Sequence, residues 1–189
     1  ALAADPDHAE ANSHLGELLA ASGQLDPAID CFQRTVKTNA DDAAAYCNLG
    51  KALFLKGDDA EGGRAIEKAV SLNPDDPETN FLLGTAHRRS GAADQAVKAF
   101  ERSLALDDGR SDVYGHLGLA LKSLGRPDEA LAALTRGLEI EPNNVFAKAA
   151  ELSLRHDLES RNRLAASSTA LRVGVHMNQR FHYALLKPL

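Results

Sequence analysis

The stretch LGELLAASG at residues 15–23 decides the fold, because three later segments repeat its pattern. Each copy begins 34 residues after the previous one, starts with Leu-Gly and ends with glycine. A repeat of this length is typical of solenoids in which every unit is a pair of helices stacked on the next pair. The sequence therefore predicts an all-α solenoid of antiparallel helix pairs. The later copies are LGKALFLKG (49–57), LGTAHRRSG (83–91) and LGLALKSLG (117–125).

The repeat divides the chain into four units when Leu-Gly is placed at positions 7 and 8. The glycine at position 15 follows the first helix of each unit, because glycine accepts the left-handed conformation that ends many helices. Position 20 holds a small residue in every unit, as two closely approaching helices require. Residues 1–8 are in phase with the end of a preceding repeat. The four units cover residues 9–42, 43–76, 77–110 and 111–144.

These units resemble the tetratricopeptide repeat (TPR). The family pattern has Leu-Gly at positions 7 and 8, alanine at 20, an aromatic residue at 24, alanine at 27 and proline at 32. Here Phe32 and Phe100 occupy position 24 and Pro74 occupies position 32, whereas Gly62 replaces the alanine at position 20. The resemblance implies a right-handed solenoid whose concave face binds extended peptides.

Composition and charge argue against several other functions. The formal net charge is −6, and nonspecific nucleic-acid binding needs a basic surface. No apolar run is long enough to predict a membrane span. Cys31 and Cys47 fall on different predicted helices without metal-binding spacing, so we expect two free thiols in a reducing compartment and a cytoplasmic location.

Catalytic and cofactor motifs are not recognisable in the sequence. The glycine-rich segment 57–64 (GDDAEGGR) lacks the Lys-Ser/Thr pair that binds phosphate and Mg²⁺. The seven histidines have neither HExxH spacing nor a pair four residues apart, which argues against a metal site. We therefore expect no catalytic residue, cofactor or metal, and no enzymatic activity, in this chain.

The candidate binding surface is the groove face, which we define as positions 2, 5, 6, 9, 12 and 13 of each unit. A helical wheel places these positions opposite the packed face of the first helix. Phe54, Leu55 and Phe81 would form an apolar anchor there, unless Phe54 and Leu55 pack between neighbouring first helices. The groove candidates are Glu17, Asn48, Lys51, Phe54, Leu55, Phe81, Arg88, Arg89, His116 and Lys122.

Two known groove patterns of this family are poorly matched. The clamp that holds chaperone tails requires lysine, arginine and asparagine at fixed positions, and Asn48 alone fits. The asparagine ladder of sugar-transferring relatives needs asparagine at position 6, where three of the four units carry His14, Leu82 and His116. Neither pattern identifies the ligand.

The C-terminal part predicts a cap followed by a different fold. Residues 145–164 are expected to form a capping helix, and 165–189 a linker and the start of an α/β domain. Residues 171–177 (LRVGVHM) alternate like a strand, and a short helix would follow. This segment resembles the start of glycosyltransferases with two Rossmann-like halves. Four residues of the cap would cover the last unit, namely Val145, Phe146, Ala149 and Leu152.

Three functions follow from this organisation. The first is a protein-interaction module that binds an extended peptide or partner in the concave groove. The second is the substrate-presenting arm of a larger, glycosyltransferase-like enzyme, so the catalytic status of a longer parent stays open. The third is a scaffold that associates with itself through the ends of the repeat stack.

Overall fold

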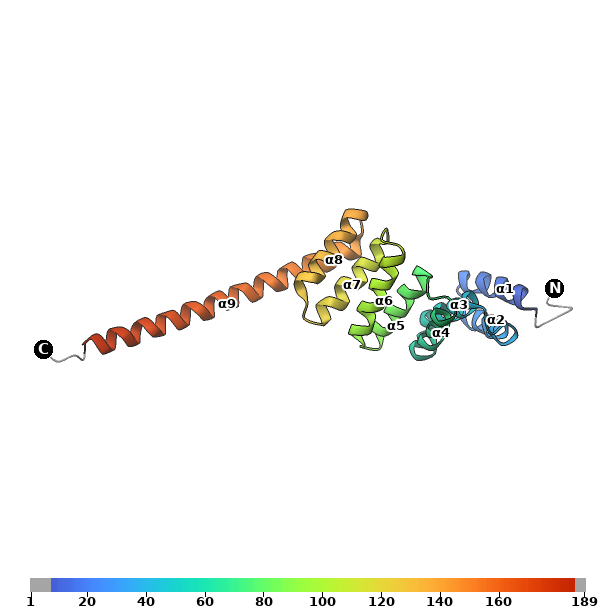
Figure 1. The fold of residues 1–189 in the computed structure, drawn as a ribbon, viewed down its shortest axis with the longest axis horizontal. Coiled ribbons are helices and arrows are strands. Elements are labelled where there is room, and N and C mark those ends of the chain that lie inside the picture. Colours follow the sequence, from blue (N-terminus) through green and yellow to red (C-terminus); the bar gives the residue numbers. More distant parts are fainter. Residues whose placement is uncertain (1–7, 186–189) are drawn as a thin grey trace.

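The computed structural model describes residues 8–185, with side chains described through residue 166, and this part consists of nine helices without a strand. Eight helices form four antiparallel pairs, and the ninth extends away from the end of the stack (Figure 1). The predicted all-α helix-pair solenoid is therefore confirmed. The pairs are α1 (Ala9–Ala21) and α2 (Leu25–Thr38), α3 (Ala43–Lys56) and α4 (Asp59–Leu72), α5 (Pro77–Arg89) and α6 (Ala93–Leu106), and α7 (Ser111–Ser123) and α8 (Pro127–Ile140), followed by α9 (Val145–Leu185).

The glycines at position 15 make the turns within the pairs. Gly23, Gly57, Gly91 and Gly125 have φ angles between 72° and 97°, a left-handed conformation that disfavours other residues. The chain reverses at each of them, and the second helix of the pair begins two residues later. The turn therefore follows directly from the glycine register.

The glycines at position 8 let the two helices of a pair approach closely. A methyl group on Gly84 would lie 2.5 Å from the Phe100 ring, and one on Gly118 would lie 2.6 Å from Leu134. Both distances are far below van der Waals contact, so a side chain at position 8 would push the helices apart. The residue at position 24 fills the space that the glycine leaves.

Gly62 departs from the repeat pattern because Phe54 occupies the space of the missing methyl group. A Cβ atom on Gly62 would lie 2.7 Å from the Phe54 ring. Phe54 is only 9% exposed and belongs to a core cluster with Cys47 and Ile66. Phe54 is therefore covered by α4 and is not an open side chain on the groove face.

The core is built from apolar clusters that link neighbouring units. One cluster joins units one and two, a second joins units two and three, and the largest joins units three and four to α9. In the largest, Phe100 of α6, Leu121 of α7 and Leu154 of α9 are all buried. Each unit thus stabilises its neighbour, as in other repeat proteins.

The cap covers unit four with a different face from the expected one. Ala147 and Leu154 are buried against the last unit, whereas Val145 and Leu152 are strongly exposed. Ala147, Ala150, Leu154 and Leu158 are spaced three, four and four residues apart and form a single stripe along the helix. The larger apolar residues expected to cover unit four, Val145, Phe146 and Leu152, all lie outside this stripe, although the Phe146 ring lies beside His116 of α7.

The expected linker and strand after the cap are replaced by helix. Helix α9 continues through residues 165–185, including the segment 171–177 that was predicted to be a strand. Position 15 would fall on Glu159, so the glycine that ends every other first helix is missing, and no proline interrupts the helix. Alternation over seven residues did not outweigh these helix-favouring features. Without the strand, the resemblance to glycosyltransferases has no structural support.

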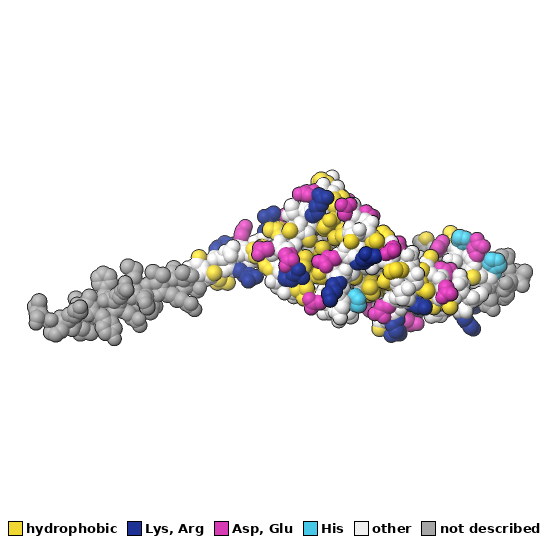
Figure 2. Space-filling model, in the orientation of Figure 1, with side chains coloured by type: hydrophobic (Ala, Val, Ile, Leu, Met, Phe, Trp, Pro, Cys, Tyr) yellow, Lys and Arg dark blue, Asp and Glu magenta, His cyan; other side chains and the backbone are white. Residues whose placement is uncertain are grey.

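The surface carries both signs of charge. Acidic and basic side chains are interspersed over the repeats in the view of Figure 2, in line with the small net charge. Within the described residues, none of the helices is both long and apolar enough to cross a membrane. We therefore expect the chain to recognise a partner through specific local contacts rather than through a broad charged surface.

Two adjacent glycines provide a test of this packing. Gly62→Ala places a methyl group inside the Phe54 ring, so we expect the free energy of unfolding to fall by about 1–3 kcal/mol. Gly63→Ala is the matched control, because its methyl group would lie 3.8 Å from Ala86 and should stabilise the helix by roughly 0.5–1 kcal/mol. Urea unfolding followed by circular dichroism measures both.

The double variant Gly62→Ala/Phe54→Leu completes the test. The smaller leucine leaves room for the methyl group, so it should recover part of the stability that Gly62→Ala loses. Equal stability of the Gly62→Ala and Gly63→Ala proteins would contradict the proposed pairing of Gly62 with Phe54.

Candidate peptide-binding groove

The groove face lies on the layer formed by the first helices α1, α3, α5 and α7, which contact one another in the stack. The residue at position 9 of one unit contacts the residue at position 6 of the next. Asn48, at position 6 of unit two, donates a hydrogen bond from its amide to Glu17, at position 9 of unit one, at 3.1 Å. The residue at position 12 of one unit contacts the residue at position 13 of the next. The guanidinium carbon of Arg89, at position 13 of unit three, lies 5.5 Å from the centre of the Phe54 ring, at position 12 of unit two. These two relations decide which groove residues can contact each other.

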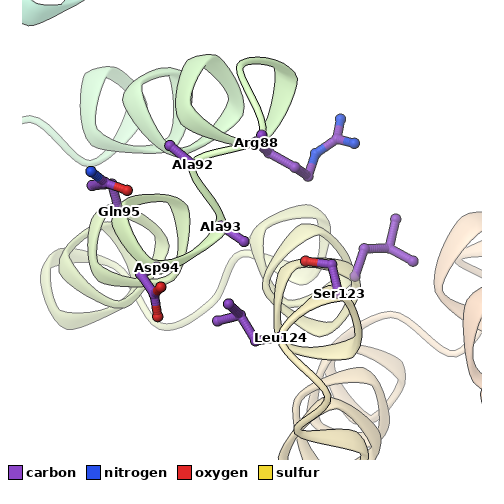
Figure 3. Close-up of a pocket in the computed structure, with 9 residues that line it drawn as sticks. Arg88, Ala92, Ala93, Asp94, Gln95, Ser123 and Leu124 are labelled. Carbon is purple, nitrogen blue, oxygen red and sulfur yellow. The ribbon is translucent and has the colours of Figure 1, made fainter.

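Two clefts border this layer, and first-helix residues contribute to the lining of both. The first cleft has a volume of about 310 Å³ and lies between α3 and α5, where Asn48, Lys51 and Glu78 contribute polar groups. Cys47 also lines it, and burial raises the pKa of its thiol, so the group stays protonated at neutral pH. The second cleft has a volume of about 660 Å³ and lies between the α5–α6 turn and α7 (Figure 3). Arg88, Leu119 and Ser123 are among the residues that line it.

A chain of ion pairs connects the units at the first cleft. Lys51 Nζ lies 3.2 Å from Glu78, and Arg110 lies 2.8 Å from both Glu78 and Asp112. The Arg110 guanidinium also lies 4.8 Å from the centre of the Phe81 ring. Burial opposes ionisation of Asp112, but hydrogen bonding to Arg110 and its charge outweigh burial and lower the pKa of Asp112.

Sequence reasoning missed Arg110, although a signal was present. Arg110 stands at position 34, directly before a first helix, where Asp42, Asp76 and Asn144 accept hydrogen bonds from the helix N-terminus. Arginine has no acceptor and cannot perform this capping role. A basic residue at this position therefore indicated a different contact, which is the stack on Phe81 and the pairing with two carboxylates.

Most of the predicted basic residues are already paired within the chain. Lys51 pairs with Glu78, as described, and Arg89 pairs with Asp59. Lys122 lies 2.7 Å from Asp157 of α9 and donates to the Ser153 hydroxyl at 3.2 Å. Of the four basic groove candidates, Arg88 is the one without an ion pair among the described residues.

The apolar groove candidates have different surroundings. Leu55 is 71% exposed and lies on the groove face as expected. Phe81 is half-buried and packs against an aromatic cluster, 6.0 Å from Phe100 and 5.3 Å from His116 between ring centres. Phe146 of α9 lies 5.1 Å from His116 on the other side. The expected apolar anchor of three residues is therefore not formed, since Phe54 and Phe81 serve packing and Leu55 alone is fully open.

His116 is half-buried in this cluster, and its pKa is lowered there. Burial lowers the pKa of the imidazole, the charge of Arg88 lowers it further, and Asp112 opposes the shift in part. The neutral ring is therefore the stable form at neutral pH.

Three polar side-chain atoms of α5 and α7 have no hydrogen-bond partner in the described structure, and one of them belongs to Arg88, which lines the second cleft. Among the residues with described side chains, Thr85 Oγ1, Arg88 Nε and His116 Nδ1 are buried without a hydrogen bond. Thr85 and Arg88 lie one turn apart on α5, and the relation of position 9 to position 6 places His116 opposite Thr85. Buried polar groups are normally paired, so this grouping is where we look for a ligand.

Comparison with known families agrees with the repeat pattern. Models of the tetratricopeptide repeat match residues 43–76 and 87–152, and a model described as TPR repeat matches residues 16–57. No sequence match was found among curated proteins. The predicted repeats are thus confirmed over most of the stack.

Solved structures share the fold. A crystal structure of MamA is 29% identical, with a TM-score of 0.71 over 75% of this chain and 82% of that chain. YrrB, described as a TPR protein with an unusual peptide-binding site, is 20% identical, with a TM-score of 0.73 over 85% and 82% of the two chains.

The first TPR domain of Spaghetti (RPAP3), bound to the HSP90 peptide SRMEEVD, is 23% identical. It has a TM-score of 0.61 and covers 64% of this chain and 96% of its own. The similarities to YrrB and RPAP3 establish a shared fold.

The half-buried imidazole predicts a pH-dependent stability. Because the pKa of His116 is lowered in the folded state, the unfolded chain takes up the proton first as the pH falls below about 6.5. The stabilisation is fully present above that pH and is lost as the pH falls toward the folded-state pKa. We expect the free energy of unfolding, measured in urea, to fall as the pH is lowered from about 7 through about 6.5 and below, and to fall less in His116→Phe. Identical pH dependence in both proteins would refute this role of His116.

Proposed function

Because the chain is built of tetratricopeptide repeats, we propose that it is a protein-interaction module whose groove face binds an extended peptide segment of a partner. The observation that carries this proposal is the row of two clefts along one layer of first helices. Their linings combine amide, hydroxyl and charged groups with apolar side chains. An extended peptide presents unpaired backbone groups and side chains at regular intervals, which such a row can satisfy.

Structures of the same fold support this proposal in a general way. YrrB has a peptide-binding site and RPAP3 binds an HSP90 peptide. The ligand of RPAP3 does not transfer to this chain, because Asn48 alone fits the chaperone clamp. The chemistry of the partner must therefore be inferred from the residues that line this groove. The first cleft offers the Asn48 amide, whereas the second offers the apolar Leu119 and the cationic Arg88.

Blocking the second cleft tests the proposal. Peptides are first selected with the wild-type protein from a random display library, and their affinity is measured by fluorescence polarisation. Leu119→Arg fills the cleft with a long charged side chain, so we expect binding to weaken by at least about tenfold. Ala132→Arg, at an exposed position of α8 in the other layer, is the matched control and should bind like the wild type.

The result could contradict the proposal in two ways. Failure to select any peptide with the wild-type protein would reject a peptide-binding groove. Equal binding by the Leu119→Arg and Ala132→Arg proteins would show that the selected peptides bind elsewhere.

Self-association through the α1 end is a second candidate function. Leu18 is 70% exposed there and Leu15 is half-exposed. The residues at the same positions of unit two, Ala52 and Leu49, are buried against neighbouring units. In the later units this surface is buried against the preceding unit. In unit one, two apolar side chains lie exposed on it.

Light scattering over a concentration series tests this second function. If copies of the chain associate through the α1 end, the average mass should rise with concentration. Leu18→Glu should abolish that rise, because association would bury an unpaired carboxylate. A mass that stays at the monomer value in the wild type would reject self-association.

A further inference from the structure

Arg88 occupies the same place in unit three that Lys122 occupies in unit four. Both stand at position 12, which meets positions 9 and 13 of the following helix. Lys122 finds Ser153 at position 9 and Asp157 at position 13, both on α9. The contact between Lys122 and Asp157 is thus an internal example of what a cation at position 12 binds.

The corresponding partners of Arg88 cannot provide an anion. Leu119 replaces Ser153 and Ser123 replaces Asp157, and both residues line the second cleft beside Arg88. The Ser123 hydroxyl already donates to the Ala120 carbonyl at 2.7 Å. The cation at position 12 is therefore present in unit three, but the carboxylate at position 13 of the next helix is missing.

The carboxylate of Asp94 does not compensate for this difference. Asp94 also lines the second cleft, but it lies on α6, across the gap from the Arg88 side chain (Figure 3). No ion pair joins Arg88 to Asp94 or to any other residue in the described part of the chain. Figure 3 shows the Arg88 side chain leaving α5 on the side of the cleft opposite Asp94, with its guanidinium turned away from Ser123 and Leu124.

We propose that the second cleft binds a carboxylate of the partner peptide, which takes the place in unit three that Asp157 takes in unit four. This inference rests on the proposed peptide-binding function and names the chemistry of one position of the ligand. Arg88 would donate from its guanidinium, whose fork geometry matches a carboxylate.

Burial and cleft shape support a carboxylate as the occupant. Arg88 Nε is buried without a hydrogen bond, so the chain leaves this guanidinium without the pairing that buried donors normally have. The cleft has room for a side chain and its neighbours, and Leu119 and Leu124 make part of its lining apolar. An acidic group next to an apolar residue therefore fits the lining best. Because the net charge of the chain is −6, this recognition depends on local contacts rather than on the overall field.

The sharpest variant supplies the missing carboxylate from within the chain. Ser123→Asp places an acid at the position of Asp157, where it should pair with Arg88 and exclude the ligand. Ser123→Asn is its matched control, with similar size and no charge. Arg88→Gln removes the cation, and Arg89→Gln is the control for that change, because Arg89 is already paired with Asp59.

The experiment measures binding of peptides selected from a random display library with the wild-type protein. We expect acidic residues or a free C-terminus to be enriched at one position. Arg88→Gln and Ser123→Asp should each weaken binding by at least about tenfold, the size expected for a hydrogen bond to a charged group. Arg89→Gln should lose clearly less affinity than Arg88→Gln, and Ser123→Asn clearly less than Ser123→Asp. Thermal unfolding by circular dichroism verifies that each variant is folded, and Ser123→Asp should be at least as stable as Ser123→Asn.

Modified peptides identify the source of the carboxylate. An acidic side chain is tested by replacing Asp or Glu with its amide, and the C-terminus is tested by amidation. The change that removes the true ligand group should weaken wild-type binding and have little further effect on Arg88→Gln, as a double-mutant cycle requires.

Three results would overturn the inference. Selected peptides without a required carboxylate would leave the groove function standing and reject the carboxylate site. Equal losses in Arg88→Gln and Arg89→Gln, or in Ser123→Asp and Ser123→Asn, would do the same. Failure to select any peptide would reject the groove function and this site with it.

Discussion

The close approach of two helices at position 8 is the constraint on which the whole stack depends. Glycine there allows the side chain at position 24 to lie directly against the backbone of the first helix, as Phe100 lies against Gly84. This contact fixes the angle between the helices of a pair and therefore the direction in which each first helix presents its remaining positions. The groove contacts are consequences of that contact, because position 12 meets position 13 of the next unit only while this angle is kept.

The same constraint explains how much could be predicted from sequence. The two glycine registers and the small residues at position 20 were sufficient for the helix pairs, since they report backbone geometry directly. The groove was harder to predict, because a helical wheel treats each helix alone, whereas positions 5 and 12 lie in the seam between neighbouring first helices. Phe54 shows the difference: it reads as exposed on its own helix, and α4 buries it beside Gly62.

The ion pairs of the groove residues could not be predicted from one position of the repeat at a time. Arg89 and Lys122 looked like free cations, but their partners Asp59 and Asp157 lie on other helices. The strand predicted at residues 171–177 is helical for a different reason. Seven alternating residues do not end a helix, and Glu159 stands where the other units have the glycine that does. In both cases the repeat register contained the needed information, provided that neighbouring units were compared position by position.

Helix α9 defines where the groove ends. It begins in register as the first helix of another unit, and Ala147 and Leu154 are buried as Ala45 and Ala52 are in unit two. Its Asp157 then neutralises Lys122, so the groove position that unit four would offer to a ligand is filled by the chain itself. The cap therefore does more than cover apolar surface. By satisfying the cation of unit four, it leaves Arg88 of unit three as the one cation without an ion pair on the described groove face, and the proposed carboxylate site is therefore confined to that unit.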